Sequence, residues 1–568
     1  MSQKTNIPKT QHAIQLVGPG QLKMNPSKAV AKPGPHQILA QIECVGLCFS
    51  DLKLLKQFSE HARKSEITSG LGAGILAEIS SYVPGDKPTV PGHEVTCRIV
   101  EVGDKVSHYK VGERCLVQTD YRDLPTANSN AAFGYNFEGG LQEYVLMDER
   151  VVIDSTGERF LISAPENLSA SSIALVEPWA CVEDSYVNSE RQSLKAGGRL
   201  LVVADAGHAI EGLGELVSKS KPAAITAIVA ENSQKAALHP LNPTASSGSD
   251  LAAVADKEFD DIIYFGARKE AIELLNDRLA PRALFNIVLG GRTIGRPVSV
   301  GIGRVHYGMT RWIGTGGASA AESYKHIPAT GEIRPGESIL VIGAGGPMGQ
   351  MHVIRTACSG IPNVTIVGAD VDDARIEALH RKVEPLAKAN RVSMRLVNSQ
   401  KNPVTEKFSY FALMAPVGAL VASSVRDSKP GCLINIFAGI PAATRQELDL
   451  DTYIANHCFM FGTSGSVIRD MKIVLQKVID RQLDTNRSVD AISGIAGAAD
   501  GIAAVENRTL AGKIVVYPML HDVGLIPLSE LPKRYPTVAA KLDGGAWSLA
   551  AEQELLKVAA PRGAAQKN

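Results

Sequence analysis

The apolar and polar positions of the chain follow two different patterns, one before and one after about residue 185. In the first part, short alternating runs are separated by turns rich in Gly, Pro and Asp. From this alternation we expect strands at 37–45, 97–102 and 114–118. The pattern indicates a compact, barrel-like β domain rather than a parallel α/β sheet.

From about Arg199 onward, apolar runs alternate with helix-like stretches. Residues 199–204 (RLLVVA), 224–229 and 261–265 are typical of buried strands, and 271–278 has a helical pattern. Alternating strands and helices predict a parallel, doubly wound sheet.

The same alternation begins again at 338–342 (SILVI) and continues through 364–368. Three pairs of segments match in the same order: 183–186 with 321–324, 198–203 with 336–341, and 312–316 with 459–464. Such strand signatures are generic, so fortuitous similarity is the alternative. Three ordered matches favour an internal duplication.

The last part of the chain predicts one more strand, at 509–518, and a charged helical tail at 531–558. A chain of 568 residues is too long for one hydrophobic core, and its length suggests about three or four domains.

Composition and charge narrow the classes of partner. The 59 basic and 59 acidic residues cancel, which argues against nucleic acid and against a membrane surface. Residues 1–9 lack the apolar core of a secretory signal, and no apolar run is long enough to span a bilayer. The eight cysteines include no CxxC pair, so we expect a reducing, cytoplasmic location and small-molecule partners.

A glycine-rich turn is the sharpest cofactor signal. It follows the expected strand at 339–342 and precedes an expected helix at 350–357. Glycines let the backbone approach a pyrophosphate, and the helix N-terminus stabilises the phosphate charge. The predicted cofactor-binding residues are Gly343, Ala344, Gly345, Gly346, Pro347, Met348 and Gly349.

Asp370 follows the next expected strand, where an acidic side chain binds a ribose hydroxyl and repels the extra phosphate of NADP. The turn and Asp370 together predict NAD as the cofactor. The alternative is that the glycines only pack a strand against a helix. At the equivalent turn of the earlier unit only Gly207 remains, and Asp205 would repel a pyrophosphate, so we expect that unit to bind no dinucleotide.

Several residues of the β-rich part have side chains that bind zinc. Cys48, His93 and either Glu94 or Glu177 would supply three protein ligands and leave a fourth position open. Taken singly, a Cys is usually a small buried apolar residue, and a His is usually on the surface or hydrogen-bonded.

A family resemblance strengthens the zinc reading. The segments GLCFSD, TVPGHE, EVGDKVSHYKVGERC, GGLQEYV and EPWACV, in this order, resemble the zinc-containing medium-chain dehydrogenase/reductase family of alcohol and polyol dehydrogenases. Within it the chain resembles the sugar-alcohol and sugar-phosphate branch, especially L-sorbose-1-phosphate reductase-like proteins.

The resemblance implies a role for each site residue. Cys48 and His93 would be zinc ligands, Glu94 an alternate or indirect ligand, and Glu177 the acidic ligand of polyol dehydrogenases. Ser50 would contact the substrate hydroxyl and pass its proton outward. Asp51 would orient the site.

The resemblance also implies an α/β protein with three domains. A GroES-like β-rich catalytic domain at 1–185, completed by 495–568, would be joined by a degenerate Rossmann-like domain at 186–330 and an NAD-binding Rossmann domain at 331–494. The region between Cys115 and Tyr144 lacks the four cysteines of a structural zinc site, so we expect one catalytic zinc and no structural zinc. Relatives commonly form dimers or tetramers, so a homo-oligomer is expected.

The expected activity is a zinc-dependent hydride transfer between NAD and a secondary alcohol or ketone of a polyol, sugar or sugar phosphate. Two alternatives remain. One is a zinc-free reductase. The other is a nucleotide sensor or structural protein that kept the fold and lost catalysis.

Overall fold

The computed structural model describes residues 7–560 except 244, 247–250, 255–257 and 464. The chain divides into two compact units, one formed by residues 1–183 and 466–568 and the other by 184–465. Among the described residues, no helix combines the length and apolar character needed to cross a membrane.

The first unit is built around an eight-stranded, mostly antiparallel sheet of order β26-β24-β25-β3-β4-β5-β9, with β8 also paired to β3. Two further pairs of strands, β1 with β2 and β6 with β7, form small antiparallel sheets of their own. The strands of the whole unit are β1 (Thr10–Leu16), β2 (Leu22–Ala29), β3 (Gln37–Gly46), β4 (Glu94–Val102), β5 (Arg114–Val117), β6 (Asp120–Pro125), β7 (Asn130–Ala132), β8 (Tyr144–Asp148), β9 (Leu161–Ser163), β24 (Val489–Gly494), β25 (Lys513–Tyr517) and β26 (Ile526–Pro527).

The helices of this unit lie between those strands and after them. They are α1 (Phe49–Gln57), α2 (Ala73–Glu78), α3 (Ala170–Ala174), α4 (Val176–Val187, which runs across the division), α14 (Ile468–Ile479), α15 (Ala498–Asn507), α16 (Leu531–Arg534), α17 (Pro536–Ala539) and α18 (Leu549–Val558). The apolar faces of β3, β4, β8 and β25 form one buried core. The strands expected at 37–45, 97–102 and 114–118 are confirmed.

The second unit contains two six-stranded parallel sheets of the same strand order. The first has the order β12-β11-β10-β13-β14-β16 and the second β19-β18-β17-β20-β21-β23. Numbered within each sheet, both read 3-2-1-4-5-6, the order of the dinucleotide-binding fold. The predicted fold class, α/β with a GroES-like part and Rossmann-like parts, is confirmed.

The first of these sheets consists of β10 (Arg199–Ala204), β11 (Ala224–Val229), β12 (Ala245–Ser246), β13 (Phe259–Phe265), β14 (Leu279–Val288) and β16 (Arg311–Thr315). The second consists of β17 (Ser338–Ile342), β18 (Thr365–Asp370), β19 (Ser393–Asn398), β20 (Phe408–Leu413), β21 (Ser428–Ile436) and β23 (Phe459–Phe461). The accompanying helices are α5 (Leu213–Ser220), α6 (Asn232–Leu238), α7 (Lys269–Asn276), α8 (Gly303–Tyr307), α9 (Ala320–Tyr324), α10 (Pro347–Cys358), α11 (Asp373–Ala389), α12 (Gly418–Arg426) and α13 (Leu450–Ala455).

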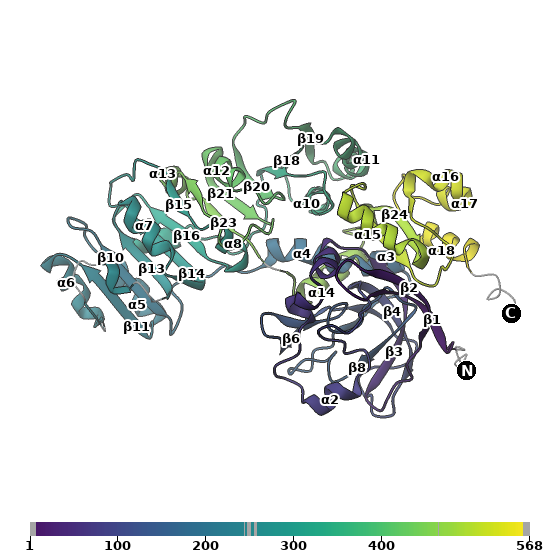
Figure 1. The fold of residues 1–568 in the computed structure, drawn as a ribbon. Coiled ribbons are helices and arrows are strands. Elements are labelled where there is room, and N and C mark those ends of the chain that lie inside the picture. The colour runs from purple at the N-terminus through teal and green to yellow at the C-terminus, as the bar shows by residue number, and fades with distance from the viewer. Residues whose placement is uncertain (1–6, 244, 247–250, 255–257, 464, 561–568) are drawn as a thin grey trace. The chain divides into compact units, whose positions relative to one another are not determined.

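The two parallel sheets meet at their last strands, β16 and β23 (Figure 1). Beside this contact, β15 (Val298–Val300) and β22 (Gln446–Leu448) form a two-stranded antiparallel sheet. Buried residues of both sheets belong to one hydrophobic core. The sheets therefore form a single compact unit, and their separation into the domains 186–330 and 331–494 stays a prediction.

One predicted boundary differs from the structure. Residues 489–494 were included in the domain 331–494, but they form β24, which pairs with β25 and β26 in the sheet of the first unit. The chain rejoins that unit at residue 466 rather than at 495. The physical reason is that the partner strands of β24 are set by the tertiary fold, because β24 runs parallel to β25 and its own residues do not specify which sheet it joins.

Candidate active site

Cys48, His93 and Glu94 lie together at one end of the eight-stranded sheet. Cys48 follows β3 and is the residue that caps α1, while His93 and Glu94 stand at the start of β4. Their ligand atoms all lie within 4.8 Å of one another. The structure thus brings together three of the four residues predicted to bind metal.

Gly46 explains how a carboxylate fits at this point of the sheet. It pairs with Glu94 across β3 and β4, and a Cβ at Gly46 would lie 2.0 Å from Glu94 Oε2. A larger residue here would displace the carboxylate, because a contact under 3 Å forces one of the two groups to move.

Asp51 connects the two strongest candidate ligands. Its Oδ2 accepts the backbone N–H of Cys48 at 3.0 Å, and its Oδ1 lies 3.1 Å from His93 Nδ1. Burial alone would raise the pKa of Asp51, but the charge and hydrogen bond of His93 outweigh it and hold that pKa below its ordinary value. An ionised Asp51 fixes the imidazole so that Nε2 is the nitrogen left for a metal.

Glu94 has one oxygen paired and one unpaired. Oε1 lies 2.5 Å from the ammonium of Lys513, whose Nζ also donates to the carbonyl of Leu47 at 2.6 Å. Oε2 is buried and has no hydrogen-bond partner among the described residues. Such an orphaned oxygen beside a cysteine and a histidine fits a divalent metal ion, since buried polar atoms are otherwise satisfied.

Glu177, on α4, stays outside the three-residue group but is electrostatically linked to it. Burial raises its pKa to about 7, with the Glu94 carboxylate adding to the rise and His93 opposing it. The metal-free chain therefore holds a carboxyl group here that ionises near neutral pH.

The remaining predicted residue of this region, Ser50, is half-buried on the first turn of α1. Two neighbours were not predicted from the sequence. The buried ring of Tyr135 lies 5.7 Å from that of His93, and Lys513 pairs with Glu94 from β25. No local pattern marks Lys513, because it is 419 positions from its partner.

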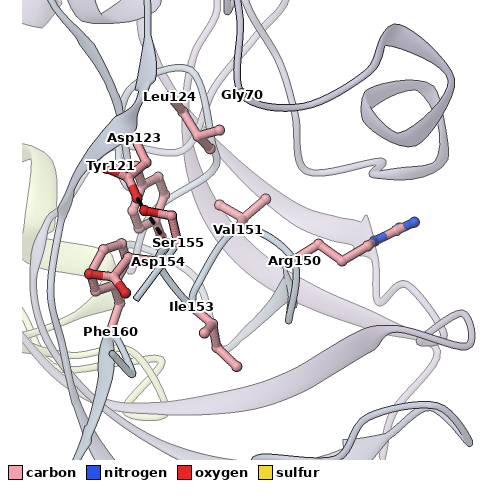
Figure 2. A pocket seen from close by; sticks show the side chains of 10 residues that line it. All are labelled: Gly70, Tyr121, Asp123, Leu124, Arg150, Val151, Ile153, Asp154, Ser155 and Phe160. Carbon is pink, nitrogen blue, oxygen red and sulfur yellow. Dashed lines mark hydrogen bonds between the residues drawn. The ribbon is translucent and has the colours of Figure 1, made fainter. Parts of the chain in front are cut away.

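One pocket of the first unit lies away from Cys48, His93 and Glu94. It has a volume of about 390 Å³ and is lined by residues of β6 and of the segment 150–160 (Figure 2). Asp123 accepts hydrogen bonds from the backbone and hydroxyl of Ser155 at its edge. None of Cys48, His93 and Glu94 lines it, so this pocket gives no support to their chemistry.

The glycine-rich turn lies between β17 and α10, as predicted. Gly343 has φ +83°, and a Cβ on Gly349 would lie 2.1 Å from the carbonyl oxygen of Gly343. Both positions need glycine for the turn itself. At Gly346, by contrast, a Cβ would meet only one atom, at 3.7 Å, so the backbone there is open to a ligand.

Asp370 closes β18 and holds the turn in place. Its Oδ2 accepts the N–H of Gly345 at 2.8 Å, and its Oδ1 accepts those of Val371 and Asp372. A carboxylate has about four acceptor positions, so one remains for a ribose hydroxyl. The arrangement of the turn and Asp370 leaves these groups free to meet a dinucleotide, and their role in binding NAD stays a prediction.

The turn after β10, in the first parallel sheet, shares one hydrogen bond with the glycine-rich turn after β17 but differs in its other contacts. The N–H of Gly207 donates to Glu231, just as Gly345 donates to Asp370. Asp205, however, is bound by the guanidinium of Arg268 and by the hydroxyl of Tyr264. A fixed carboxylate at this position opposes a pyrophosphate.

Comparisons with known proteins agree with this description. Residues 34–156 match the alcohol dehydrogenase GroES-like domain. The uncharacterized protein YggP of Escherichia coli (strain K12) is 26% identical over 312 residues, which cover 48% of this chain and 71% of that protein.

Two further matches concern butanediol dehydrogenase of Bacillus subtilis. The (R,R)-butanediol dehydrogenase of strain 168 is 28% identical over 186 residues, covering 30% of this chain and 44% of that protein. A crystal structure of 2R,3R-butanediol dehydrogenase from this species covers 90% of this chain and 100% of its own at 13% identity, with a TM-score of 0.47.

The fold and the matched segment define a chain with a GroES-like domain of the alcohol dehydrogenase kind. The matched domain takes up residues 34–156, and the relatives named here are less than 30% identical to the chain. This sequence match spans less than half the length of the named butanediol dehydrogenase.

Proposed function

We propose that the chain is a zinc-dependent oxidoreductase that transfers a hydride between NAD and a secondary alcohol or ketone. The observation that carries the proposal is the convergence of Cys48, His93 and Glu94, with a buried Glu94 oxygen that no described residue contacts by a hydrogen bond. Zinc held there would supply a Lewis acid for the substrate oxygen.

The surrounding residues would divide the remaining work. Ser50 would accept the hydroxyl proton during oxidation and release it toward solvent, while the carbinol hydride goes to the nicotinamide. Asp51 would hold His93 in one tautomer, and Lys513 would neutralise part of the charge of Glu94. Gly343–Gly349 and Asp370 would bind and orient the NAD pyrophosphate and ribose.

For the substrate we propose a polyol, a sugar or a sugar phosphate. Relatives named sorbitol dehydrogenase and D-xylulose reductase support the first two. Of the two basic residues at 63 and 64, Lys64 is buried and donates to two backbone carbonyls. The guanidinium of Arg63 lies over the ring of Tyr135 and pairs with Asp120 at 3.6 Å, so a substrate phosphate would have to compete with that carboxylate.

The test measures NADH formation by the purified chain on a panel of polyols, sugars and their phosphates, before and after removal of metal. The proposal expects activity that a chelator abolishes and zinc restores. Cys48→Ser and His93→Ala should lose it while NADH still binds, and Cys358→Ser, in the other unit, should retain it. Full activity in either ligand variant would contradict the proposal.

We also propose that the two parallel sheets arose by duplication and that only the second binds NAD. The identical strand order and the shared contact of Gly207 and Gly345 support a common origin. Asp205, held by Arg268, supports the loss of dinucleotide binding in the first sheet. A zinc-free sensor remains the alternative if NAD binds and no substrate reacts.

A further inference from the structure

A second group of metal-binding side chains lies in the first unit, formed by His12, Glu143 and His521. His12 is on β1, Glu143 directly precedes β8, and His521 lies between β25 and β26. Their ligand atoms all lie within 4.8 Å of one another. This group shares no residue with the one at Cys48.

Both imidazoles converge on one carboxylate oxygen. His12 Nδ1 and His521 Nε2 each lie 2.9 Å from Glu143 Oε1, and the two ring centres are 4.0 Å apart. His521 Nε2 is buried and has no hydrogen-bond partner among the described residues, although it is so close to the carboxylate. The nitrogen thus faces the oxygen without the geometry of a hydrogen bond.

The charge of Glu143 is also left without a full counterion. The residue is 4% exposed, and its other contact is the backbone N–H of His12, which donates to Oε1 at 2.8 Å. Within the described part of the chain, no Lys or Arg forms an ion pair with it. A buried carboxylate is costly unless a cation accompanies it, and two histidines meet this need only when protonated.

We propose that His12, Glu143 and His521 form a second metal site, for a zinc-like divalent cation. Two imidazole nitrogens and one carboxylate oxygen are a ligand set that zinc uses, with water in the fourth position. The histidine side chains are 31% and 28% exposed, which leaves a path for the ion. Tetrahedral bonds of about 2.0–2.1 Å place ligand atoms about 3.3 Å apart, so each nitrogen-to-oxygen distance of 2.9 Å would widen by about 0.4 Å.

This site would tie together three segments that are remote in the sequence. His12 and Glu143 are 131 positions apart, and His521 comes from the segment that returns to the unit after residue 465. A metal bond between them would restrict the unfolded chain far more than the native one. The site is therefore a stabilising one, and it adds a metal ion to the single zinc expected at Cys48.

The test separates the two sites by their ligands. Metal content is measured after equilibration with Zn²⁺ and dialysis, in the Cys48→Ser/His93→Ala background, which removes the first site without touching the second. This background should retain one metal ion, and adding His521→Ala or His12→Ala should remove it. His108→Ala is the matched control, because His108 also contacts a carboxylate, Glu149, and is in no three-residue group.

Two further readouts do not depend on enzyme activity. Co²⁺ in the same background should give ligand-field bands without a thiolate-to-cobalt band, because the second site has no cysteine. Zn²⁺ should raise the melting temperature of the background and of its His108→Ala form, but not of its His521→Ala form. Absence of retained metal in the background, or equal metal content with and without His521, would overturn the proposal.

Discussion

Asp51 offers the sharpest test of how the zinc site is held together. Its carboxylate is buried and accepts the N–H of Cys48 at 3.0 Å and that of Gly92 at 3.3 Å, while it lies 3.1 Å from His93 Nδ1. Asp51→Asn keeps the shape of the side chain but turns one acceptor oxygen into an NH₂ donor. One of the two sides must then lose its hydrogen bond.

The size of the effect follows from these contacts. If the NH₂ group of the new side chain faces Cys48, it meets the backbone N–H of Cys48, and two donors oppose each other. If it faces His93, the imidazole loses the acceptor oxygen that fixes its tautomer. Loss of such an orienting partner typically weakens metal binding by about 10- to 100-fold, or about 1.4–2.8 kcal/mol. We expect the upper half of this range, because the variant also removes a negative charge next to the metal.

Competition with a chromophoric chelator measures the zinc affinity of the first site when both chains also carry His521→Ala, which removes the second group of ligands. Asp123→Asn is the control, since Asp123 is also hydrogen-bonded but pairs with Ser155 near the other pocket. Circular dichroism shows whether each variant is folded. A folded Asp51→Asn chain that binds zinc as tightly as the wild type refutes the argument, whereas zinc binding by neither chain refutes the zinc proposal itself.

Three further predictions concern the turn, the buried ion pair and Glu177. Gly349→Ala should weaken NADH binding, seen by fluorescence, by at least about tenfold, because its Cβ would lie 2.1 Å from the Gly343 carbonyl oxygen. Lys513→Met should lower the free energy of unfolding by about 3–5 kcal/mol in urea titrations, because it leaves the Glu94 carboxylate buried alone. In the metal-free chain, Glu177 titrates at about 7 rather than 4.5, so the free energy of unfolding should fall by up to about 3 kcal/mol as pH rises through that window. Glu177→Gln should remove this slope.

The first two of these have matched controls. Gly214→Ala meets no atom within 4 Å and should leave NADH binding unchanged. Lys472→Met breaks a more exposed pair with Glu158 and should cost less than about 1 kcal/mol. Equal losses for Lys472 and Lys513, or a Glu177→Gln chain with the wild-type pH slope, would contradict the reasoning.

Much of the fold could be predicted from the sequence because its signals are local. The runs 199–204 and 224–229 coincide with β10 and β11, since buried parallel strands are apolar throughout. The prediction of a helical tail at 531–558 is wrong in one respect, because this segment contains three separate helices, α16, α17 and α18. Pro536 starts a new helix, and Gly544 and Gly545 have positive φ, so no continuous helix can pass them.

The residues of the candidate sites could be predicted only where they belong to a recognisable sequence motif. Cys48 and His93 are distant in sequence, and the family resemblance alone suggested that they meet. Lys513 and His521 had no such support, because their partners lie far away along the chain and each is an ordinary residue in its own segment. Contacts of this kind depend on how residues 466–568 fold back into the first unit. The hydrophobic periodicity of the sequence carries no information about that arrangement.

The pairing of β15 with β22 has a consequence for symmetry. Along the chain β15 comes between β14 and β16, and β22 comes between β21 and β23. The two strands run antiparallel, with Ser299 opposite Glu447. Equivalent segments that pair in this way are related by a local two-fold axis, the relation that an isologous homodimer makes with two chains. Here a covalent linker joins both halves, so the strands meet at an effective concentration fixed by the chain and independent of the amount of protein in solution.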